Sequence, residues 1–342
     1  MKAKKRYKLA LLGMDSLRGK EIKNIFGQKR FPAYDLEFFD PEVQEEYSKL
    51  TDFKKEPKVI HGLKGDPLTG MDLVFLAAGA ETSLAYGLRA LEGGPRAIDL
   101  SEAFNGRDDV PLLVSGVNDA GLKAEAPRLV ANPHPVTIIL SHVFHRLLGA
   151  YGLARAVAFV LEPVSAFEDP GIQELASQSV ALLNSHVPKK KVFKEQIAYS
   201  LLSHNGPTDG RGFRPDELRA GAEIRRVLGR PDFPLSLSFV QAPVFHTYSI
   251  MTYLELDREA DIAALEELFR EGPVFKLGAF REGCSASSVT VSGKDEIFVG
   301  QIKTEAANPR AAWIWLVADN LTRGSALNAF ELAKKILAAK AD

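Results

Sequence analysis

The first structural unit of the chain opens with Tyr7-Lys8-Leu9-Ala10-Leu11-Leu12-Gly13-Met14-Asp15-Ser16-Leu17-Arg18-Gly19. The apolar run that stops at Gly13 is typical of a buried parallel strand, and the stretch from there to Phe26 has the character of a helix. Gly13 and Gly19 have the spacing of the outer glycines of a dinucleotide-binding fingerprint. Ser16 stands at the middle position, where glycine would let the backbone approach a pyrophosphate. The alternative is an ordinary tight turn between a strand and a helix.

An acidic residue follows the second apolar run of the chain. Leu36 to Phe39 predicts a second strand, and Asp40 comes directly after it. An acid at this place suits a ribose hydroxyl and repels a 2′-phosphate, so the pattern favours NAD over NADP if a dinucleotide binds.

Strands alternate with helices through the first 130 residues or so. Asp72 to Ala78 predicts a third buried strand, closed by Gly79, and a helix follows through Leu91. Arg96 to Leu100 and Pro111 to Val114 predict two further strands. This alternation predicts an α/β fold with a doubly wound parallel sheet.

A junction between strand and helix stands at Ala131-Asn132-Pro133-His134-Pro135-Val136-Thr137. It opens a long apolar helix, predicted from Val136 to Leu148. α/β enzymes use such junctions for nucleophiles, because the first N–H groups of a helix can stabilise negative charge. Pro135 offers neither a nucleophile nor an N–H at this place.

The pattern changes after this helix and predicts a mixed sheet with covering helices. The alternation in Leu235 to Val240 predicts an antiparallel strand with one covered face, with Ile250 to Leu256 as its neighbour. The remaining expected elements are strands at Ala156 to Val164, Ile297 to Ile302 and Ala311 to Ala318, and helices at Asp169 to Asn184, Ile262 to Phe269 and Ala326 to Ala339.

Composition limits the classes of partner and cofactor. With 342 residues, 46% hydrophobic, 25% charged and a net charge of -1, the chain suits a globular protein of two domains and gives no electrostatic reason to expect nucleic acid or membrane as partner. No signal peptide or membrane span is expected, which predicts a cytoplasmic protein. The lone Cys284 excludes an internal disulfide, and His142 and His145 lack further ligands at metal-binding spacing, so no metal is expected.

Several segments together resemble the aspartate-semialdehyde dehydrogenase family over nearly the whole chain. They include Ile98 to Phe104, Val110 to Val114, Ala131 to Pro133, Arg225 to Gly229, Ala242 to Phe245, Lys294 to Gly300, and Trp315 to Leu321 with Gly324 and Asn328. The resemblance implies a Rossmann-type domain at residues 1–131 plus the C-terminal helix 325–342. It also implies an α+β domain with a mixed sheet at 132–324, which would carry substrate and the dimer interface.

The family's chemistry needs a cysteine thiolate, a histidine base, a positioning glutamine and arginines that hold carboxylate and phosphate. By the resemblance, this chain replaces the cysteine with Pro135, the glutamine with Glu162, the histidine with Tyr248, and two arginines with Asn105 and Gln241. The family's Ser-Gly-Ala-Gly loop becomes Ser165-Ala166-Phe167-Glu168, whose larger side chains would crowd a nicotinamide. A basic residue is kept as Arg219. Matches to family positions near the dinucleotide are Gly13, Gly19, Ala78, Gly79 and Asn328.

The resemblance therefore implies a catalytically degenerate paralogue, like the Usg-type proteins that the family includes. It would be a homodimer with a binding, regulatory or assembly role, and NAD or NADP binding is possible. One alternative is an NAD-dependent oxidoreductase that uses Tyr248 or His134 as acid–base without covalent catalysis. Another is a heteromeric partner of an active homologue. The sequence names neither a ligand nor a physiological role.

Overall fold

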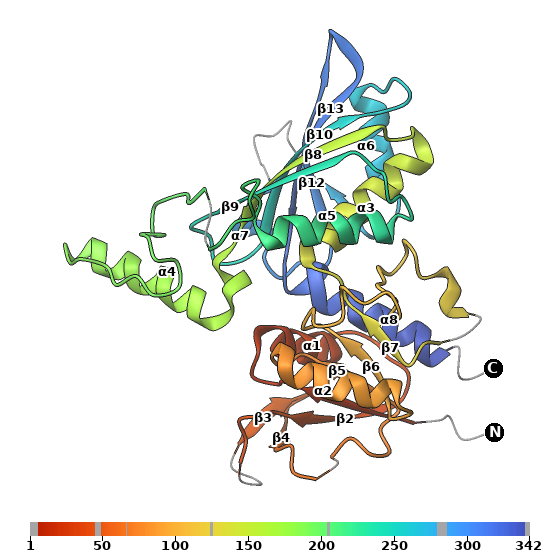
Figure 1. Ribbon diagram of the computed structural model, residues 1–342, viewed down its shortest axis with the longest axis vertical. Helices are drawn as coiled ribbons and strands as arrows, with labels where there is room; N and C mark the ends of the chain where they lie inside the picture. Colours follow the sequence, from red (N-terminus) through yellow and green to blue (C-terminus); the bar gives the residue numbers. More distant parts are fainter. Residues whose placement is uncertain are drawn as a thin grey trace. The chain divides into compact units, whose positions relative to one another are not determined.

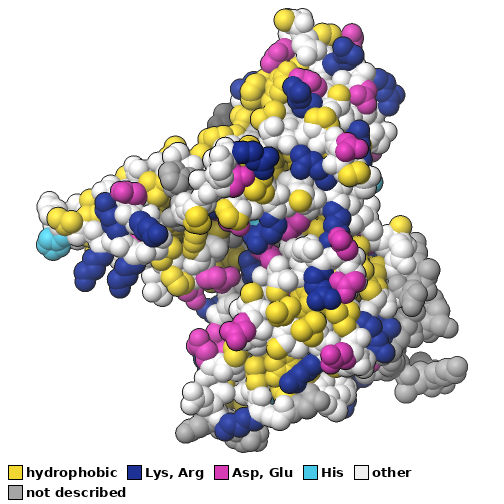
Figure 2. Space-filling view, in the orientation of Figure 1, with side chains coloured by type: hydrophobic (Ala, Val, Ile, Leu, Met, Phe, Trp, Pro, Cys, Tyr) yellow, Lys and Arg dark blue, Asp and Glu magenta, His cyan; other side chains and the backbone are white. Residues whose placement is uncertain are grey.

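Figure 1 shows the computed structural model of the chain, which describes residues 6–44, 49–65, 67–123, 126–203, 206–278 and 286–338. The chain divides into two compact units. Unit 1 comprises Met1–His134 and Ser325–Asp342, and unit 2 comprises Pro135–Gly324. Among the described residues, no helix is both long and apolar enough to cross a membrane. Charged side chains of both signs are interspersed over the visible face, in keeping with the near-neutral net charge (Figure 2).

Unit 1 is built on a seven-stranded sheet with the order β3-β4-β2-β1-β5-β6-β7. The neighbours from β4 to β7 pair in parallel, as the alternation of strands and helices predicted, whereas β3 is antiparallel to β4. The strands are β1 (Tyr7–Leu12), β2 (Tyr34–Phe39), β3 (Leu50–Phe53), β4 (Glu56–His61), β5 (Leu73–Leu76), β6 (Arg96–Asp99) and β7 (Leu129–Ala131). The helices are α1 (Leu17–Gln28), α2 (Ala80–Leu91), the 3-10 turn η1 (Ala120–Lys123) and α8 (Leu327–Ala338). Although α8 comes last in the chain, its Phe330 packs edge-on against Phe26 of α1.

The hairpin β3–β4 was not predicted. Its turn consists of Lys54 and Lys55, both with positive φ, at 53° and 68°. Two-residue hairpin turns of this kind usually contain Asn-Gly or Asp-Gly, and that signal is missing here. Pro57 and the mostly exposed side chains of both strands weaken the strand signal further.

The predicted strand from Pro111 to Val114 is wrong. Only an isolated bridge joins Leu112 to Ala131, and the last strand of the sheet is β7. Two backbone hydrogen bonds join this segment to Ala131, from Leu113 N and to Pro111 O, and side-chain amides bond to most of its other polar groups. Asn118 accepts from Val114 N and donates to Leu112 O, while Asn328 donates to Leu113 O. An apolar run is buried here as a loop because side chains satisfy its polar backbone.

Unit 2 contains a six-stranded mixed sheet with the order β11-β12-β13-β10-β8-β9. The strands are β8 (Arg155–Glu162), β9 (Leu235–Gln241), β10 (Tyr248–Glu255), β11 (Phe275–Leu277), β12 (Ile297–Glu305) and β13 (Asn308–Ala318). The helical segments are α3 (Pro135–Ala150), the 3-10 turn η2 (Val164–Phe167), α4 (Glu168–Leu183), α5 (Pro215–Val227), α6 (Ile262–Arg270), α7 (Ser288–Val291) and the π-helix η4 (Thr322–Ala326).

Two expectations about β9 are corrected by this topology. It pairs in parallel with β8, not antiparallel, and its sequence neighbour β10 lies between β8 and β13 instead of beside it. The chain between β8 and β9 carries α4 and α5, and parallel neighbours require a long crossover connection of this kind. The alternation of apolar side chains in β9 correctly predicted that one face of the strand is covered, but such a pattern does not depend on strand direction.

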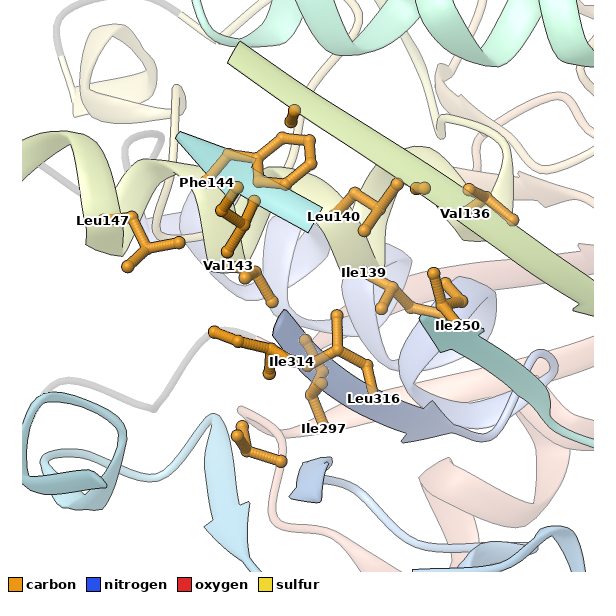
Figure 3. Packing of buried hydrophobic residues seen from close by; sticks show 14 of the residues in the cluster. Val136, Ile139, Leu140, Val143, Phe144, Leu147, Ile250, Ile297, Ile314 and Leu316 are labelled. Atoms are coloured by element: carbon orange, nitrogen blue, oxygen red, sulfur yellow. The ribbon is translucent and has the colours of Figure 1, made fainter. Parts of the chain in front are cut away.

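The core of unit 2 lies between this sheet and the helices α3, α5 and α6. Figure 3 shows one face of α3, with Val136, Ile139, Leu140 and Val143, turned toward Ile250, Ile297, Ile314 and Leu316 of the strands. On the opposite face of β8, Val157 and Phe159 are 40% and 46% exposed. Helix α4 projects away from the sheet (Figure 1).

Candidate functional site

The glycine turn after β1 is held by close backbone contacts. Gly13 has a φ of +92°, and a Cβ added to it would lie 2.3 Å from the nitrogen of Ala78 at the end of β5. A Cβ on Gly19 would lie 2.0 Å from the carbonyl oxygen of Gly13. Both positions therefore need glycine for the packing of the turn itself. Gly13, Ala78 and Gly79 come together at the carboxyl ends of β1 and β5, the edge where parallel sheets bind dinucleotides.

Ser16, at the middle position of the fingerprint, is the N-cap of α1. Its hydroxyl oxygen accepts from the N–H of Gly19 at 2.9 Å and its hydroxyl donates to the carbonyl of Gly13 at 2.9 Å. The side chain is thus used inside the turn, in the usual role of a serine before the first helical residue. The replacement of glycine by serine has a structural explanation, and the turn keeps its close approach to β5.

An acidic group lies beside the glycine turn. Asp40 is 3% exposed, and its two carboxylate oxygens accept from the backbone N–H groups of Asp15 at 3.0 Å and Glu42 at 3.1 Å. The carboxylate oxygens of Asp15, Asp40 and Glu42 lie within 4.8 Å of one another. Lys49 pairs with Asp15, and this bond together with the surrounding carboxylates raises the pKa of Lys49. The surplus of negative charge here would repel a second phosphate group on a ribose.

Asn328 ties parts of unit 1 together. It is 1% exposed, and its amide donates to Leu113 O at 3.0 Å and Asn132 Oδ1 at 2.8 Å, and accepts from Ser115 N at 2.7 Å. These bonds join the start of α8 to the segments that flank β7. The hydrogen bonds of Asn328 are therefore made to residues near β7, whereas the glycine turn follows β1.

The turn that contains Asn105 is organised by a buried carboxylate. Asp99 accepts from Ser101 N at 2.9 Å, Ser101 Oγ at 2.6 Å and Phe104 N at 3.3 Å. Burial raises the pKa of Asp99 although these hydrogen bonds oppose the shift. Asn105, itself 3% exposed, follows in this turn.

In unit 2, three of the expected pocket residues form one row on adjacent strands. Gln241 ends β9, Glu162 ends β8, and Tyr248 begins β10. Glu162 is in register with Gln241, and the next pair across β8 and β10 is Leu161 with Ser249. All three side chains are at most 2% exposed, on the face that the helices cover. The amide of Gln241 donates to the carbonyl of Glu162 at 2.9 Å.

A fourth residue, which the sequence did not single out, completes this row. Arg214 is the N-cap of α5, and its Nη2 lies 2.9 Å from Oε2 of Glu162. The side chains of the two residues are 4% and 3% exposed. The hydroxyl of Tyr248 lies 3.5 Å from the other carboxylate oxygen of Glu162. We call Gln241, Glu162, Tyr248 and Arg214 the polar row.

The first turn of α5 supports Arg214. Glu217 accepts from the backbone N–H groups of Arg214 and Phe239, both at 2.7 Å, which fixes the start of the helix against β9. Asp216 lies between two arginines, 3.4 Å from Nη2 of Arg214 and 2.8 Å from Nη2 of Arg219. Burial lowers the pKa of Arg214, but the charge and hydrogen bond of Glu162, with Asp216, outweigh it and raise the pKa overall. Arg219 is itself about 40% exposed.

Pro135 is the first residue of α3, the position at which proline is best tolerated in a helix. A Cβ on Gly324 would lie 2.9 Å from Cβ of Pro135, so the proline ring is closely packed. His134 is 6% exposed and is the last residue of the first segment of unit 1. His142 is buried on α3 whereas His145 is exposed, and Cys284 lies outside the described residues.

The loop after β8 keeps an unusual backbone. Glu168 has φ 55° and ψ −159°, a conformation that is essentially confined to glycine. This is the position at which the resemblance implies the second glycine of the Ser-Gly-Ala-Gly loop. Phe167 packs edge-on against Phe193 at 5.1 Å, in the small apolar cluster beside α4, and Ser165 accepts from Asn320 Nδ2 at 3.0 Å.

Comparisons with known proteins agree with this architecture. Residues 8–125 match the semialdehyde dehydrogenase, NAD binding domain, and residues 146–323 match the semialdehyde dehydrogenase, dimerisation domain. An aspartate-semialdehyde dehydrogenase of Prochlorococcus marinus is 27% identical over 330 residues, 96% of this chain and 95% of that protein. A USG-1 protein homolog of Pseudomonas aeruginosa is 29% identical, over 96% of this chain and 97% of that protein. The solved structure of a probable aspartate-semialdehyde dehydrogenase from Pseudomonas aeruginosa has a TM-score of 0.90 at 28% identity, and covers 97% of this chain and 99% of that one.

Proposed function

Because the chain belongs to the semialdehyde dehydrogenase family, we propose that it is a paralogue without the family's covalent chemistry that binds NAD as a homodimer and acts by binding, regulation or assembly. The observation that carries the proposal is Pro135 at the start of α3. The resemblance places the attacking cysteine there. Proline has no group that can form a thiohemiacetal, and loss of a covalent nucleophile commonly lowers the rate by about 10⁴ to 10⁶.

The polar row supports the same conclusion. The resemblance places a histidine base at Tyr248 and a substrate arginine at Gln241. In this chain Tyr248 and Gln241 both contact Glu162, and Glu162 is paired with Arg214. Because these groups hydrogen-bond to one another, the atoms that they share are engaged within the protein and do not form a base and an anion clamp directed at substrate.

Residues of unit 1 support NAD as the dinucleotide. The pyrophosphate would lie beside the glycine turn at the N-terminus of α1, since helix N-termini favour anions. The acids Asp15, Asp40 and Glu42 would disfavour the extra phosphate of NADP. When bound, the nicotinamide would supply hydride transfer. The match of residues 146–323 to a dimerisation domain supports the homodimer.

A turnover assay tests this function. Purified protein is incubated with aspartate semialdehyde and phosphate, with NADP or NAD, and the absorbance of the reduced nicotinamide is followed beside an active family member. We expect no phosphate-dependent reduction above background. Clear turnover by the native chain would contradict the proposal. In parallel, NAD is expected to raise the melting temperature more than NADP at equal concentration, since binding to the native state stabilises it.

A non-covalent NAD-dependent oxidoreductase is a second candidate, favoured by the phenol of Tyr248 beside the carboxylate of Glu162. It requires NAD-dependent turnover of some substrate that is lost in Tyr248→Phe or His134→Ala. A heteromer with an active homologue is tested by co-purification, and recovery of homodimer alone would count against it.

A further inference from the structure

The ion pair of the polar row uses only one edge of the Arg214 guanidinium. Nη2 contacts both Glu162 and Asp216, whereas Nη1 is buried and has no hydrogen-bond partner among the residues that the structure describes. Oε1 of Gln241 is also buried, and none of the described residues donates a hydrogen bond to it. Buried donors and acceptors of this kind are rare, and a guanidinium matches the paired oxygens of a carboxylate or phosphate. Arg214 therefore has the chemistry of an oxyanion receptor.

The carboxylate of Glu162 already occupies the accepting place. It lies 2.9 Å from Nη2, is 3% exposed, and is presented from the end of β8 in register with Gln241. By the resemblance, position 162 is a neutral glutamine and position 241 an arginine. Here the negative charge is on β8 and the positive charge is on the cap of α5. An oxyanion that approached Arg214 would meet the charge of Glu162 and that of Asp216 beside it.

We propose that Glu162 is an internal substitute for an oxyanion ligand: it holds Arg214 and thereby excludes phosphate and small carboxylates from the polar row. The proposal rests on the proposed function, because it explains why the polar row would not bind the anionic reactants of the family. Neutralising Glu162 then converts Arg214 into a site for a small oxyanion.

The test measures phosphate binding, not turnover. Melting curves and calorimetric titrations with inorganic phosphate, against chloride at matched ionic strength, compare the native chain with Glu162→Gln. The native chain is expected to show no saturable, phosphate-specific stabilisation, whereas Glu162→Gln is expected to show saturable binding, with a dissociation constant about tenfold or more below the detection limit set by the native chain. The gain is expected to disappear in the double variant Glu162→Gln with Arg214→Gln. The matched control is Glu267→Gln, which removes the carboxylate from an exposed pair with Arg270 and is expected to gain nothing.

Chemical rescue provides a second, independent readout. Glu162→Ala removes the carboxylate and leaves space for a small one, so acetate is expected to restore its melting temperature in a saturable manner that requires Arg214. Native phosphate binding that is lost in Arg214→Gln would overturn the proposal, because Arg214 would then be an open receptor. A folded Glu162→Gln that gains no binding, or variants that neither phosphate nor acetate restores, would overturn it as well. Turnover in the assay above would contradict the proposed function without altering these binding results.

Discussion

The backbone conformation of Glu168 predicts that glycine is more stable than alanine at this position, the reverse of the usual order. Its φ of 55° and ψ of −159° lie in a region that costs residues other than glycine about 1–3 kcal/mol. Substitution by glycine releases this strain, whereas substitution by alanine keeps it. Both changes remove the same carboxylate from the first turn of α4, so its favourable interaction with the helix dipole, about 0.3–1 kcal/mol, cancels in the comparison.

The remaining difference between the two variants is the flexibility of glycine in the unfolded chain, about 0.4–1 kcal/mol. Subtracting it from the strain leaves Glu168→Gly more stable than Glu168→Ala by about 1 kcal/mol, with an upper limit near 2.5 kcal/mol. For a unit of this size, 1 kcal/mol corresponds to a rise in melting temperature of about 2–4 °C.

Tryptophan fluorescence is a selective probe for this measurement, because the chain has two tryptophans and both, Trp313 and Trp315, lie on β13 of unit 2. Urea unfolding followed by this signal gives the stability of each variant. The control is the neighbouring Asp169, which has no positive φ. There, glycine is expected to be less stable than alanine by about 1 kcal/mol, the ordinary helix preference. Equal stability of the two Glu168 variants, or a more stable alanine, would refute the strain argument.

Three further predictions follow from buried charge and close packing. Arg214→Met removes the guanidinium that pairs with the buried carboxylate of Glu162 and is expected to destabilise unit 2 by about 3–5 kcal/mol. The double variant with Glu162→Gln is expected to lose less than the sum of the single changes in urea unfolding. Burial raises the pKa of Asp99 above its usual 3.8, so the folded state favours the protonated acid and its contribution to stability falls as pH rises from about 4 through the folded pKa. Asp99→Asn should therefore lose less stability than the native chain across that window, and parallel curves would contradict this. Gly13→Ala places a Cβ 2.3 Å from Ala78 N at a φ of +92° and should destabilise unit 1 by more than about 1 kcal/mol in thermal unfolding. Its control is Gly27→Ala, in an open and exposed helical position, which should stabilise the same unit by about 0.5–1 kcal/mol.

Local composition predicted the elements that are buried deeply enough to require an apolar sequence. The apolar runs at β1, β5 and β6 and the long apolar helix α3 were all found from the sequence, because strands covered on both faces and core helices must be apolar. The run at β2 was found from its buried end, Phe38 and Phe39. The same signal failed at Pro111 to Val114, which pairs with β7 only at Ala131 and bonds to side-chain amides beyond that point. It also missed the hairpin β3–β4, whose turn lysines have no characteristic composition.

The sequence by itself determined one chemical fact about this protein, which is that Pro135 cannot act as a nucleophile in any fold. It could not determine that Arg214 belongs with Glu162, because 52 positions separate the two residues and an arginine in a polar loop has no periodicity to reveal its partner. Only the tertiary structure decided this, since the packing of α5 over β8 and β9 brings the helix cap to the ends of the strands. A covalent property belongs to a residue alone, whereas a buried charge pair depends on contacts between distant segments.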